Sequence, residues 1–410
     1  MYFLIGKTLG YSHSPAIHRA FGRYDYQLHP LPPEELEDCL RSGEWEGLNV
    51  TIPYKQAVIP FLDALSDTAK RIGAVNTIVR EKDGTLTGHN TDYAGFLAMA
   101  ENAGIDFAGR KTVVLGSGGA SQMAQTAARD RGAREIAVIS RSGPDNYQNL
   151  SRHADADLLV NTTPVGTYPG IGESPVSLEL FPNLQGVLDV VYNPLRTQLV
   201  LEAQKKGIPA GGGLLMLVAQ AAQACELFTG RPVAADETER VYRKTRAAVQ
   251  SIALIGMPGS GKSTVGRMAA QALNLPFADA DAEIEKRAGC AIPDIFARQG
   301  EQAFRDMESE VLEELTRRGG IVLACGGGAV LRQSNRDALR RNALVVRLIR
   351  PLESLPTEGR PLSRGPEALR EMAKVREPFY SAAADVAVTN DKTPEETVKR
   401  VLEAFREWRM

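Results

Sequence analysis

The 410-residue sequence has few cysteines, no long hydrophobic run and almost no excess of charge of either sign. Its four cysteines, Cys39, Cys225, Cys290 and Cys325, are far apart and form no CxxC pair, which argues against a zinc site or a disulfide framework. Because reduced thiols are typical of the cytoplasm, we expect a cytoplasmic protein. The 48 basic and 50 acidic side chains leave a formal charge of −2, so no charge excess favours nucleic acid or anionic lipid as a partner.

The sequence also shows no segment typical of a secretory signal or of a membrane span. The start, MYFLIGKTLG, lacks the basic region and the small-residue cleavage site of a secretory signal. The most apolar segment, residues 214–228, contains Gln220, Gln223 and Glu226, whereas a membrane span needs about 20 predominantly apolar residues. We therefore predict a globular protein with no membrane partner.

Short β-rich runs alternate with helical patterns along the whole chain. Examples of the runs are TVVLG (112–116), IALIG (252–256) and LVVRLI (344–349). This alternation predicts an α/β architecture with mainly parallel sheets. At about 150 residues per domain, the length predicts two or three domains.

The first glycine-rich loop, GSGGAS at 116–121, follows a predicted strand and opens a predicted helix. Glycine lets the backbone approach a pyrophosphate, and the helix N-terminus offers N–H groups, although an ordinary tight turn would look the same. The next strand ends in Ser140-Arg141-Ser142, without the acidic residue that binds the ribose of NAD. Since a guanidinium flanked by hydroxyls suits a 2′-phosphate, we predict NADP(H); a solvated surface arginine is the alternative.

The second glycine-rich loop, GMPGSGKS at 256–263, fits the P-loop pattern G-x-x-x-x-G-K-S, with a strand before it and a helix after it. In such a loop backbone N–H groups hold phosphates, Lys262 reaches the β- and γ-oxygens and Ser263 binds Mg²⁺. We expect the following Asp279 and Asp281 to share a strand and point the same way, one supporting Mg²⁺ and one accepting a proton. The two loops therefore predict two different nucleotide sites.

Four motifs in the first hundred residues each have an ordinary structural explanation. Ser14, in SHSP, fits a helix N-cap before a proline. Lys55 fits a surface lysine, Asn76 a turn asparagine and Asp92 a helix cap. Taken singly, none of them establishes a site.

Together, and in this order, the motifs resemble the shikimate dehydrogenase family over residues 1 to about 245. They are SHSP (12–15), NVTIPYK (49–55), GAVNT (73–77), GHNTDYAG (88–95), LGSGGAS (115–121), NTTPVG (161–166), DVVYNP (189–194) and GGLLMLVAQAA (212–222). The resemblance implies that Lys55 and Asp92 are catalytic. The implied substrate-binding residues are Ser12, Ser14, Thr51, Lys55, Asn76, Asp92, Tyr192 and Gln220. The implied NADP-binding residues are Gly116, Ser117, Gly118, Gly119, Ala120, Ser140, Arg141, Ser142, Thr162 and Gly213.

From about residue 250 to 410 the motifs resemble the shikimate kinase family. They are the P-loop, the ADAD run, GEQAFRDMESE (300–310), CGGGAV (325–330), GRPLSR (359–364) and KVREPFY (374–380). The resemblance implies catalytic roles for Lys262, Asp281 and the lid residue Arg360, and Mg²⁺ binding by Ser263 and Asp279. The implied ATP-binding residues are Gly259, Ser260, Gly261, Lys262, Ser263, Thr264 and Arg360. The implied shikimate-binding residues are Asp281, Arg305, Gly326, Gly327, Gly328 and Arg376, and for each arginine a solvated ion pair is the alternative.

These resemblances imply a domain organisation and an activity. Residues 1–102 and 213–247 would form a substrate-binding domain, 103–212 a Rossmann-like NADP domain and 250–410 a P-loop kinase with a parallel sheet. We expect a bifunctional enzyme of the shikimate pathway that reduces 3-dehydroshikimate with NADPH and phosphorylates shikimate with ATP and Mg²⁺. The expected partners are these small molecules, and a homodimer is left open.

Two departures from the family patterns affect these expectations. The run SRSGPDNYQ has Asp145 but no second arginine, which predicts weaker discrimination for NADP. The segment RPLESLPTE before the lid motif is short, which predicts less complete closure. A regulatory protein with silent sites and a quinate-type oxidoreductase fused to the kinase are the alternatives. The intact catalytic sets disfavour the first, and Ser14 and Arg141 disfavour the second.

Overall fold

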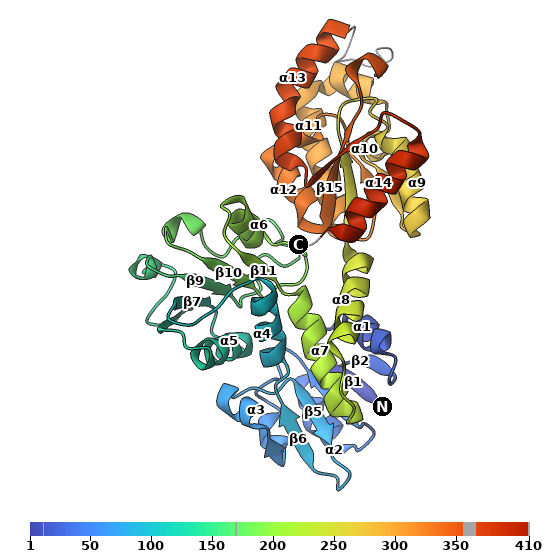
Figure 1. Cartoon of the computed structure of the whole chain (residues 1–410). Helices are drawn as coiled ribbons and strands as arrows, with labels where there is room; N and C mark the ends of the chain where they lie inside the picture. Colours follow the sequence, from blue (N-terminus) through green and yellow to red (C-terminus); the bar gives the residue numbers. More distant parts are fainter. Residues whose placement is uncertain (11, 169, 356–365, 409–410) are drawn as a thin grey trace. The chain divides into compact units, whose positions relative to one another are not determined.

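The computed structural model describes residues 1–10, 12–168, 170–355 and 366–408. The chain forms two compact units, Met1–Arg246 and Ala247–Met410, each coloured continuously along the sequence in Figure 1. No helix in the described part of the chain is both long and apolar enough to cross a bilayer.

The first sheet of unit Met1–Arg246 is mixed, with the strand order β2-β1-β3-β5-β6-β4. Its strands are β1 (Tyr2–Gly6), β2 (Tyr26–Pro30), β3 (Gly47–Val50), β4 (Ala64–Leu65), β5 (Thr77–Arg80) and β6 (Leu86–His89). β1 pairs in parallel with β2 and β3, whereas β5 is antiparallel to both β3 and β6. Three of the five pairings in this sheet are parallel, as expected, and β5 is the antiparallel exception, because the short turn between β5 and β6 can join only antiparallel neighbours.

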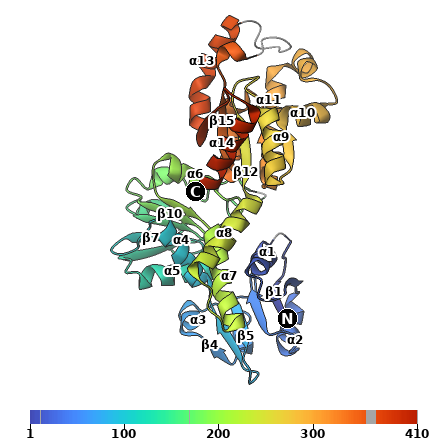
Figure 2. The same ribbon diagram turned by 45° about the vertical axis from the view of Figure 1, so that its right-hand side comes forward.

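Helices from both ends of this unit pack on the first sheet or on the helices beside it. They are α1 (Ser14–Phe21), α2 (Leu36–Arg41), α3 (Asp67–Ile72), α4 (Asp92–Asn102), α7 (Leu214–Thr229) and α8 (Ala235–Val249). α7 lies alongside α4 in both ribbon views (Figures 1 and 2). The close approach depends on Gly95, where a Cβ would lie 2.5 Å from the Met216 carbonyl oxygen. Residues after the second sheet therefore return to the lobe that the first hundred residues begin.

The second sheet of this unit is entirely parallel, in the order β11-β10-β9-β7-β8. Its strands are β7 (Lys111–Leu115), β8 (Glu135–Ile139), β9 (Leu158–Asn161), β10 (Gly186–Asp189) and β11 (Ala210–Gly212), with helices α5 (Gly119–Asp130) and α6 (Gln198–Lys205). Val114 packs with Met123 of α5 on one face, and Val113 packs with Leu199 of α6 on the other. Burial on both faces explains why these strands are continuous hydrophobic runs.

Unit Ala247–Met410 has one parallel sheet in the order β13-β14-β12-β15-β16. Its strands are β12 (Ser251–Ile255), β13 (Phe277–Asp279), β14 (Val322–Ala324), β15 (Ala343–Ile349) and β16 (Val386–Thr389). Its helices are α9 (Lys262–Leu273), α10 (Ala280–Ala288), α11 (Ile292–Arg318), α12 (Gln333–Asn342), α13 (Pro366–Ala383) and α14 (Pro394–Glu407). α9 and α14 share one buried cluster with the sheet, and α11, α12 and α13 share the cluster on its other face. The expected α/β fold class is confirmed in both units.

Candidate active sites

Lys55 and Asp92 form a direct ion pair in the first unit. Lys55 lies just after β3, Asp92 begins α4, and the Lys55 Nζ to Asp92 Oδ2 distance is 2.5 Å. The backbone around Lys55 is held by a hydrogen bond from Val75 N to Lys55 O of 2.7 Å. A Cβ on Gly119, at the start of α5, would lie 3.9 Å from Lys55 Cδ. The pair predicted to be catalytic therefore lies against the glycine turn predicted to bind NADP.

The glycine turn itself leaves bare backbone at the start of a twelve-residue helix. Gly116 has a φ of +107°, and a Cβ there would lie 2.7 Å from Thr162 Oγ1. Thr162 is fixed because its Oγ1 donates to Leu115 O at 2.6 Å. A Cβ on Gly118 would meet nothing within 4 Å, so open space faces this backbone. Ser117 and Ala120 belong to the same turn, and the arrangement fits a dinucleotide pyrophosphate.

The turn after β8 carries the predicted 2′-phosphate ligand, Arg141. Arg141 is exposed, and Ser140 N donates to Asp145 O at 3.2 Å, closing the turn around Ser142. The carboxylate of Asp145 lies 3.2 Å from His153 Nε2. This turn therefore offers one guanidinium to a 2′-phosphate. Asp145 stands in the run where a second basic residue was expected, and its carboxylate faces His153.

The remaining predicted substrate ligands fall into two groups. Asn76 and Gln220 are linked through Thr91, whose Oγ1 accepts from Asn76 Nδ2 at 3.0 Å and lies 3.3 Å from Gln220 Oε1. Thr91 directly precedes Asp92, so this group adjoins the ion pair. Thr51 is placed by a backbone hydrogen bond from its N–H to Ile5 O of 3.0 Å.

The SHSP motif forms the second group. Ser14 N donates to Ser12 Oγ at 3.2 Å, and the N-cap of α1 is His13, so the alternative of Ser14 as the cap is wrong. The His13 ring lies 5.7 Å from the Tyr192 ring. Gly213 caps α7, and a Cβ there would overlap the Val190 carbonyl.

Asp189 joins two of the sequence motifs but was not predicted as a functional residue. Its buried carboxylate accepts from Thr197 Oγ1 at 2.6 Å, Val191 N at 3.0 Å and Asn161 Nδ2 at 3.0 Å. Burial raises the pKa of Asp189 to about 6, although these three donors favour the ionised form. Through these hydrogen bonds the Asp189 carboxylate links the ends of β9 and β10, three residues before Tyr192 in the sequence.

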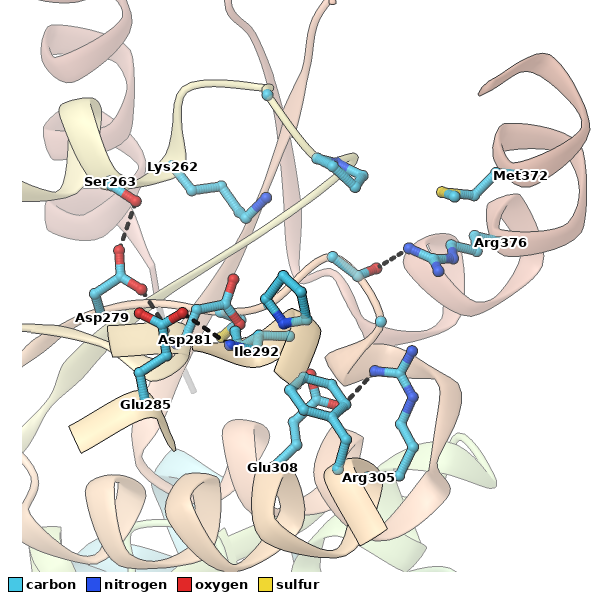
Figure 3. A pocket seen from close by; sticks show the side chains of 18 of the residues that line it. Lys262, Ser263, Asp279, Asp281, Glu285, Ile292, Arg305, Glu308, Met372 and Arg376 are labelled. Atoms are coloured by element: carbon cyan, nitrogen blue, oxygen red, sulfur yellow. Dashed lines mark hydrogen bonds and ion pairs between the residues drawn. The ribbon is translucent and has the colours of Figure 1, made fainter. Parts of the chain in front are cut away.

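The second unit contains a cavity of about 630 Å³ bordered by the P-loop (Figure 3). Lys262 Nζ donates to the carbonyl oxygens of Gly256 and Met257, both at 3.0 Å. Gly259 and Gly261 have φ values of +84° and +94°, which turn the loop around its N–H groups. The loop residues that line the cavity are Pro258, Gly259, Gly261, Lys262, Ser263 and Thr264, while Ser260 is buried beneath them.

Asp279 and Asp281 border the same cavity but do not share a strand. Asp279 ends β13 and caps α10, because its Oδ1 accepts from Asp281 N at 3.1 Å and Ala282 N at 3.4 Å. Asp281 lies in the first turn of α10, so the expectation that both residues lie on one strand is wrong. An aspartate at an N-cap satisfies helix N–H groups that a strand would not expose. Burial, then the neighbouring Asp279, raises the pKa of Asp281.

Ser263 Oγ donates to Asp279 Oδ2 at 2.6 Å. This pair presents hard oxygen ligands at the base of the P-loop, which suits Mg²⁺ held partly by nucleotide phosphates. No cluster of three or more histidine, cysteine or acidic side chains that could hold a metal alone occurs in the described residues. The donor set therefore fits Mg²⁺ better than a metal enclosed by protein.

Arg305 and Arg376 lie across the cavity from Lys262 (Figure 3), and Gly326, Gly327 and Gly328 line the same cavity. Arg305 Nη1 lies 2.8 Å from Glu308 Oε2, and Arg376 Nη1 donates to Gly327 O at 2.9 Å. A Cβ on Gly326 would lie 2.6 Å from Asp281 Oδ1, and one on Gly328 would overlap the Arg305 guanidinium. Glycine at these positions therefore keeps the arginines and Asp281 close to the backbone.

Several cavity-lining residues were not predicted from the sequence as ligands. They are Glu285, Phe296, Phe304, Glu308, Cys325, Arg350 and Met372. Burial raises the pKa of Glu308, and the Arg305 guanidinium opposes this shift. Phe304, Glu308 and Cys325 lie within the motifs GEQAFRDMESE and CGGGAV, but none of them was predicted as a ligand. The predicted lid residue Arg360 lies outside the described residues.

A lysine–aspartate pair beside a dinucleotide turn, and a P-loop cavity with two arginines, define an oxidoreductase joined to a phosphotransferase. Comparison with known proteins agrees with this class. Residues 4–78 match the family model of the shikimate dehydrogenase substrate-binding domain, and residues 258–406 match that of shikimate kinase.

Relatives and solved structures extend the match across the first unit. The chain is 37% identical over 247 residues to the shikimate dehydrogenase (NADP(+)) of Clostridium beijerinckii, covering 55% of this chain and 91% of that protein. A Thermus thermophilus shikimate 5-dehydrogenase in complex with NADP(H) and shikimate is 35% identical, with a TM-score of 0.54 over 60% of this chain and 98% of that one. A Corynebacterium glutamicum quinate dehydrogenase in complex with NAD is 29% identical, with a TM-score of 0.54 over 60% and 97%.

The chain belongs to the shikimate dehydrogenase family and carries a shikimate kinase domain after it. Both resemblances drawn from the sequence motifs are thereby confirmed.

Proposed function

We propose that this chain catalyses two consecutive reactions, reducing 3-dehydroshikimate to shikimate with NADPH and then phosphorylating the 3-hydroxyl of shikimate with ATP. The observation that carries the proposal is the presence of two separate sites in one chain. Lys55 and Asp92 pair beside a dinucleotide turn, and Lys262, Asp281 and Arg305 border one cavity. The likeness to proteins named for NADP(H) and shikimate supports the choice of substrates.

In the first reaction, bound NADPH supplies the hydride to the C3 carbonyl carbon. Lys55 lies 2.5 Å from Asp92, so its ammonium is held in one direction by the carboxylate. The ammonium stabilises the negative charge that develops on the carbonyl oxygen and donates a proton to it. Asn76 and Gln220 hold the ring hydroxyls, and Arg141 binds the 2′-phosphate of the nucleotide.

In the second reaction, Lys262 and the P-loop N–H groups hold the ATP phosphates, and Ser263 with Asp279 holds Mg²⁺, which neutralises phosphate charge when bound. Asp281 accepts the proton of the attacking hydroxyl, and its raised pKa makes it a stronger base than an exposed aspartate. Arg305 and Arg376 bind the carboxylate of shikimate, for which a planar guanidinium is suited.

The two reactions are chemically linked through one oxygen atom. The carbonyl oxygen that Lys55 protonates becomes the hydroxyl that attacks phosphorus near Asp281. Both sites would therefore recognise the same carboxylated ring, which gives a chemical reason for fusing them.

A coupled assay tests the proposal. The whole chain is supplied with 3-dehydroshikimate, NADPH, ATP and Mg²⁺, and NADPH absorbance and phosphorylated product are followed together. We expect NADPH consumption followed by a phosphorylated acid that needs both cofactors. A protein that neither oxidises shikimate nor consumes ATP in its presence would contradict the proposal.

A quinate-type activity of the first unit is the second candidate, supported by the likeness to the quinate dehydrogenase and by the single guanidinium at Arg141. Competition between quinate and shikimate, with NAD and NADP each as oxidant, decides between them. We expect shikimate with NADP to give the higher kcat/KM.

A cytoplasmic location and a homodimeric state are part of the same proposal. The four free thiols support a reducing compartment. Light scattering of the purified chain distinguishes a monomer of 44.4 kDa from a homodimer of twice that mass.

A further inference from the structure

A continuous chain of buried side chains leads to the two amides predicted to bind the substrate in the first unit. It runs from Tyr26 through Asn49, Thr77, Asn76 and Thr91 to Gln220. All six residues are at most 8% exposed. They come from β2, β3, β5, the start of α4 and α7, so residues far apart in the sequence meet here.

Backbone groups fix the orientation of each amide in this chain. Asn49 Nδ2 faces the carbonyl oxygen of Asn76 at 3.3 Å, and its Oδ1 accepts from Tyr26 at 2.8 Å. Thr91 N–H donates to Asn76 Oδ1 at 2.7 Å, so the opposite atom of Asn76 is its nitrogen. Gln220 Nε2 donates to Leu217 O at 2.9 Å, which turns its Oε1 toward Thr91.

With the amides fixed, one assignment of the two threonine hydroxyl protons makes the chain continuous, and Thr91 Oγ1 also lies 3.2 Å from Thr77 Oγ1 and 3.3 Å from Asn76 Oδ1. Thr77 Oγ1 accepts from Asn49 Nδ2 at 3.0 Å and donates to Asn76 Oδ1 at 3.2 Å. Thr91 Oγ1 accepts from Asn76 Nδ2 at 3.0 Å and donates to Gln220 Oε1 at 3.3 Å. Every donor then points along the chain in one direction, from Tyr26 to Gln220.

We propose that Thr91 is a positioning residue that fixes Asn76 and Gln220 with an N–H of each amide available to the substrate. Each amide nitrogen carries two N–H bonds. One N–H of Asn76 donates to Thr91 Oγ1, and one N–H of Gln220 donates to Leu217 O, so each amide keeps a second N–H for a ligand. The site would therefore select ligands whose ring oxygens accept hydrogen bonds from both amides. Without the Thr91 hydroxyl, Asn76 would keep only its bond from Thr91 N–H and Gln220 only its bond to Leu217 O, so each amide would be held less firmly. This inference rests on the proposed dehydrogenase activity.

Thr91→Val tests the proposal because it keeps the shape of the side chain and removes the hydroxyl. Loss of one buried hydrogen-bonding group predicts a 10- to 100-fold higher KM for 3-dehydroshikimate, a smaller change in kcat and an unchanged KM for NADPH. Thr91→Ser, which restores the hydroxyl, should return KM to within about threefold of the unchanged protein. The matched control is Thr112→Val, because Thr112 is also fully buried but its hydroxyl has no hydrogen-bond partner.

A second comparison separates positioning from a general loss of structure. If Thr91 acts through the amides, Thr91→Val should add little to the KM of Gln220→Ala, because the amide it orients is already gone. Full additivity of the two changes, or a Thr91→Val protein that keeps its KM, would overturn the proposal. If Thr91→Val does not fold, Thr77→Val carries the same test with a smaller rise in the same KM. Thermal unfolding of each variant, followed by circular dichroism, measures folding of the first unit, and activity of the unchanged protein tests the proposed function separately.

Discussion

The two sites hold their cations in opposite ways. In the first unit Lys55 is paired with a carboxylate at 2.5 Å, so its charge is balanced before a ligand arrives. In the second unit Lys262 and Arg376 are held by neutral carbonyl oxygens of the P-loop and of Gly327. Arg305 is an exception, because Glu308 accompanies it.

This difference follows from the proposed reactions. Reduction of a carbonyl requires one proton delivered in a fixed direction, and an ion pair supplies that direction. Transfer of a phosphoryl group requires positive charge near several oxygens, and Lys262, Arg305 and Arg376 bring such charge to one cavity. The first site therefore depends on the direction in which Asp92 holds Lys55. The second site depends on its positive charge and on glycines that leave the backbone accessible.

The largest effect we expect is that of removing charge at Asp281. Asp281→Asn cannot accept a proton from the attacking hydroxyl, so the kinase kcat should fall by about 10²- to 10⁴-fold. The control is Glu283→Gln on the same helix, whose carboxylate lies 3.8 Å from Arg287 and does not line the cavity. Steady-state phosphorylation rates measure both variants. Similar rates for Asp281→Asn and the unchanged protein would show that charge does not govern this site.

Gly328→Ala tests whether the second site requires a residue without a side chain next to Arg305. The backbone φ of −101° at Gly328 suits alanine, but the new methyl group would displace the Arg305 guanidinium. Loss of a charged contact to the shikimate carboxylate predicts a KM for shikimate about 10- to 100-fold higher in the kinase assay. The KM for shikimate in the dehydrogenase assay of the same protein is the internal control. A rise in the KM for ATP instead would place Gly328 on the nucleotide side.

The single guanidinium of the first nucleotide site gives a smaller expected effect. Arg141→Ala should raise the KM for NADPH about tenfold and leave that for NADH unchanged, since one exposed charge-assisted hydrogen bond is lost. Arg131→Ala, at the other end of α5, is the matched control. Equal changes with both nucleotides would mean that Arg141 does not bind the 2′-phosphate.

The smallest effect concerns stability and Asp189. Its pKa is about 6 in the folded protein against 3.8 when exposed, so the folded state binds the proton more tightly. The stabilisation is complete below pH 3.8 and is lost as the pH rises through 6, by at most about 3 kcal/mol. Hydrogen exchange of the β9 and β10 amides between pH 4.5 and 7.5 should show this loss in the unchanged protein. Asp189→Asn, which does not titrate, should not show this loss. If hydrogen exchange in the variant and in the unchanged protein depends on pH in the same way, Asp189 is not the source of the pH dependence.

Local patterns in the sequence predicted much of both sites. The P-loop spacing placed Lys262 at a helix start, and the predicted strand at 112–116 differs from β7 by one residue at each end. These features depend on residues close in sequence. The parallel second and third sheets were predicted from the alternation of short β-rich runs with helical patterns.

Features that depend on distant contacts could not be predicted. Thr91 meets Gln220 across 129 positions, and no spacing in the sequence indicates that contact. The antiparallel pairing of β5 follows from a turn whose polar residues look like any loop. Asp281 was placed on a strand because its alternation with Asp279 was given more weight than the preference of Asp279 for a helix N-cap.

Independent sites in one chain are the central claim, and reciprocal lysine variants test it most directly. Lys55→Ala should lower NADPH-dependent reduction by about 10²- to 10⁴-fold and leave phosphorylation of shikimate intact. Lys262→Ala should do the reverse. Loss of both activities in either correctly folded variant, or full retention of the targeted activity, would contradict the account.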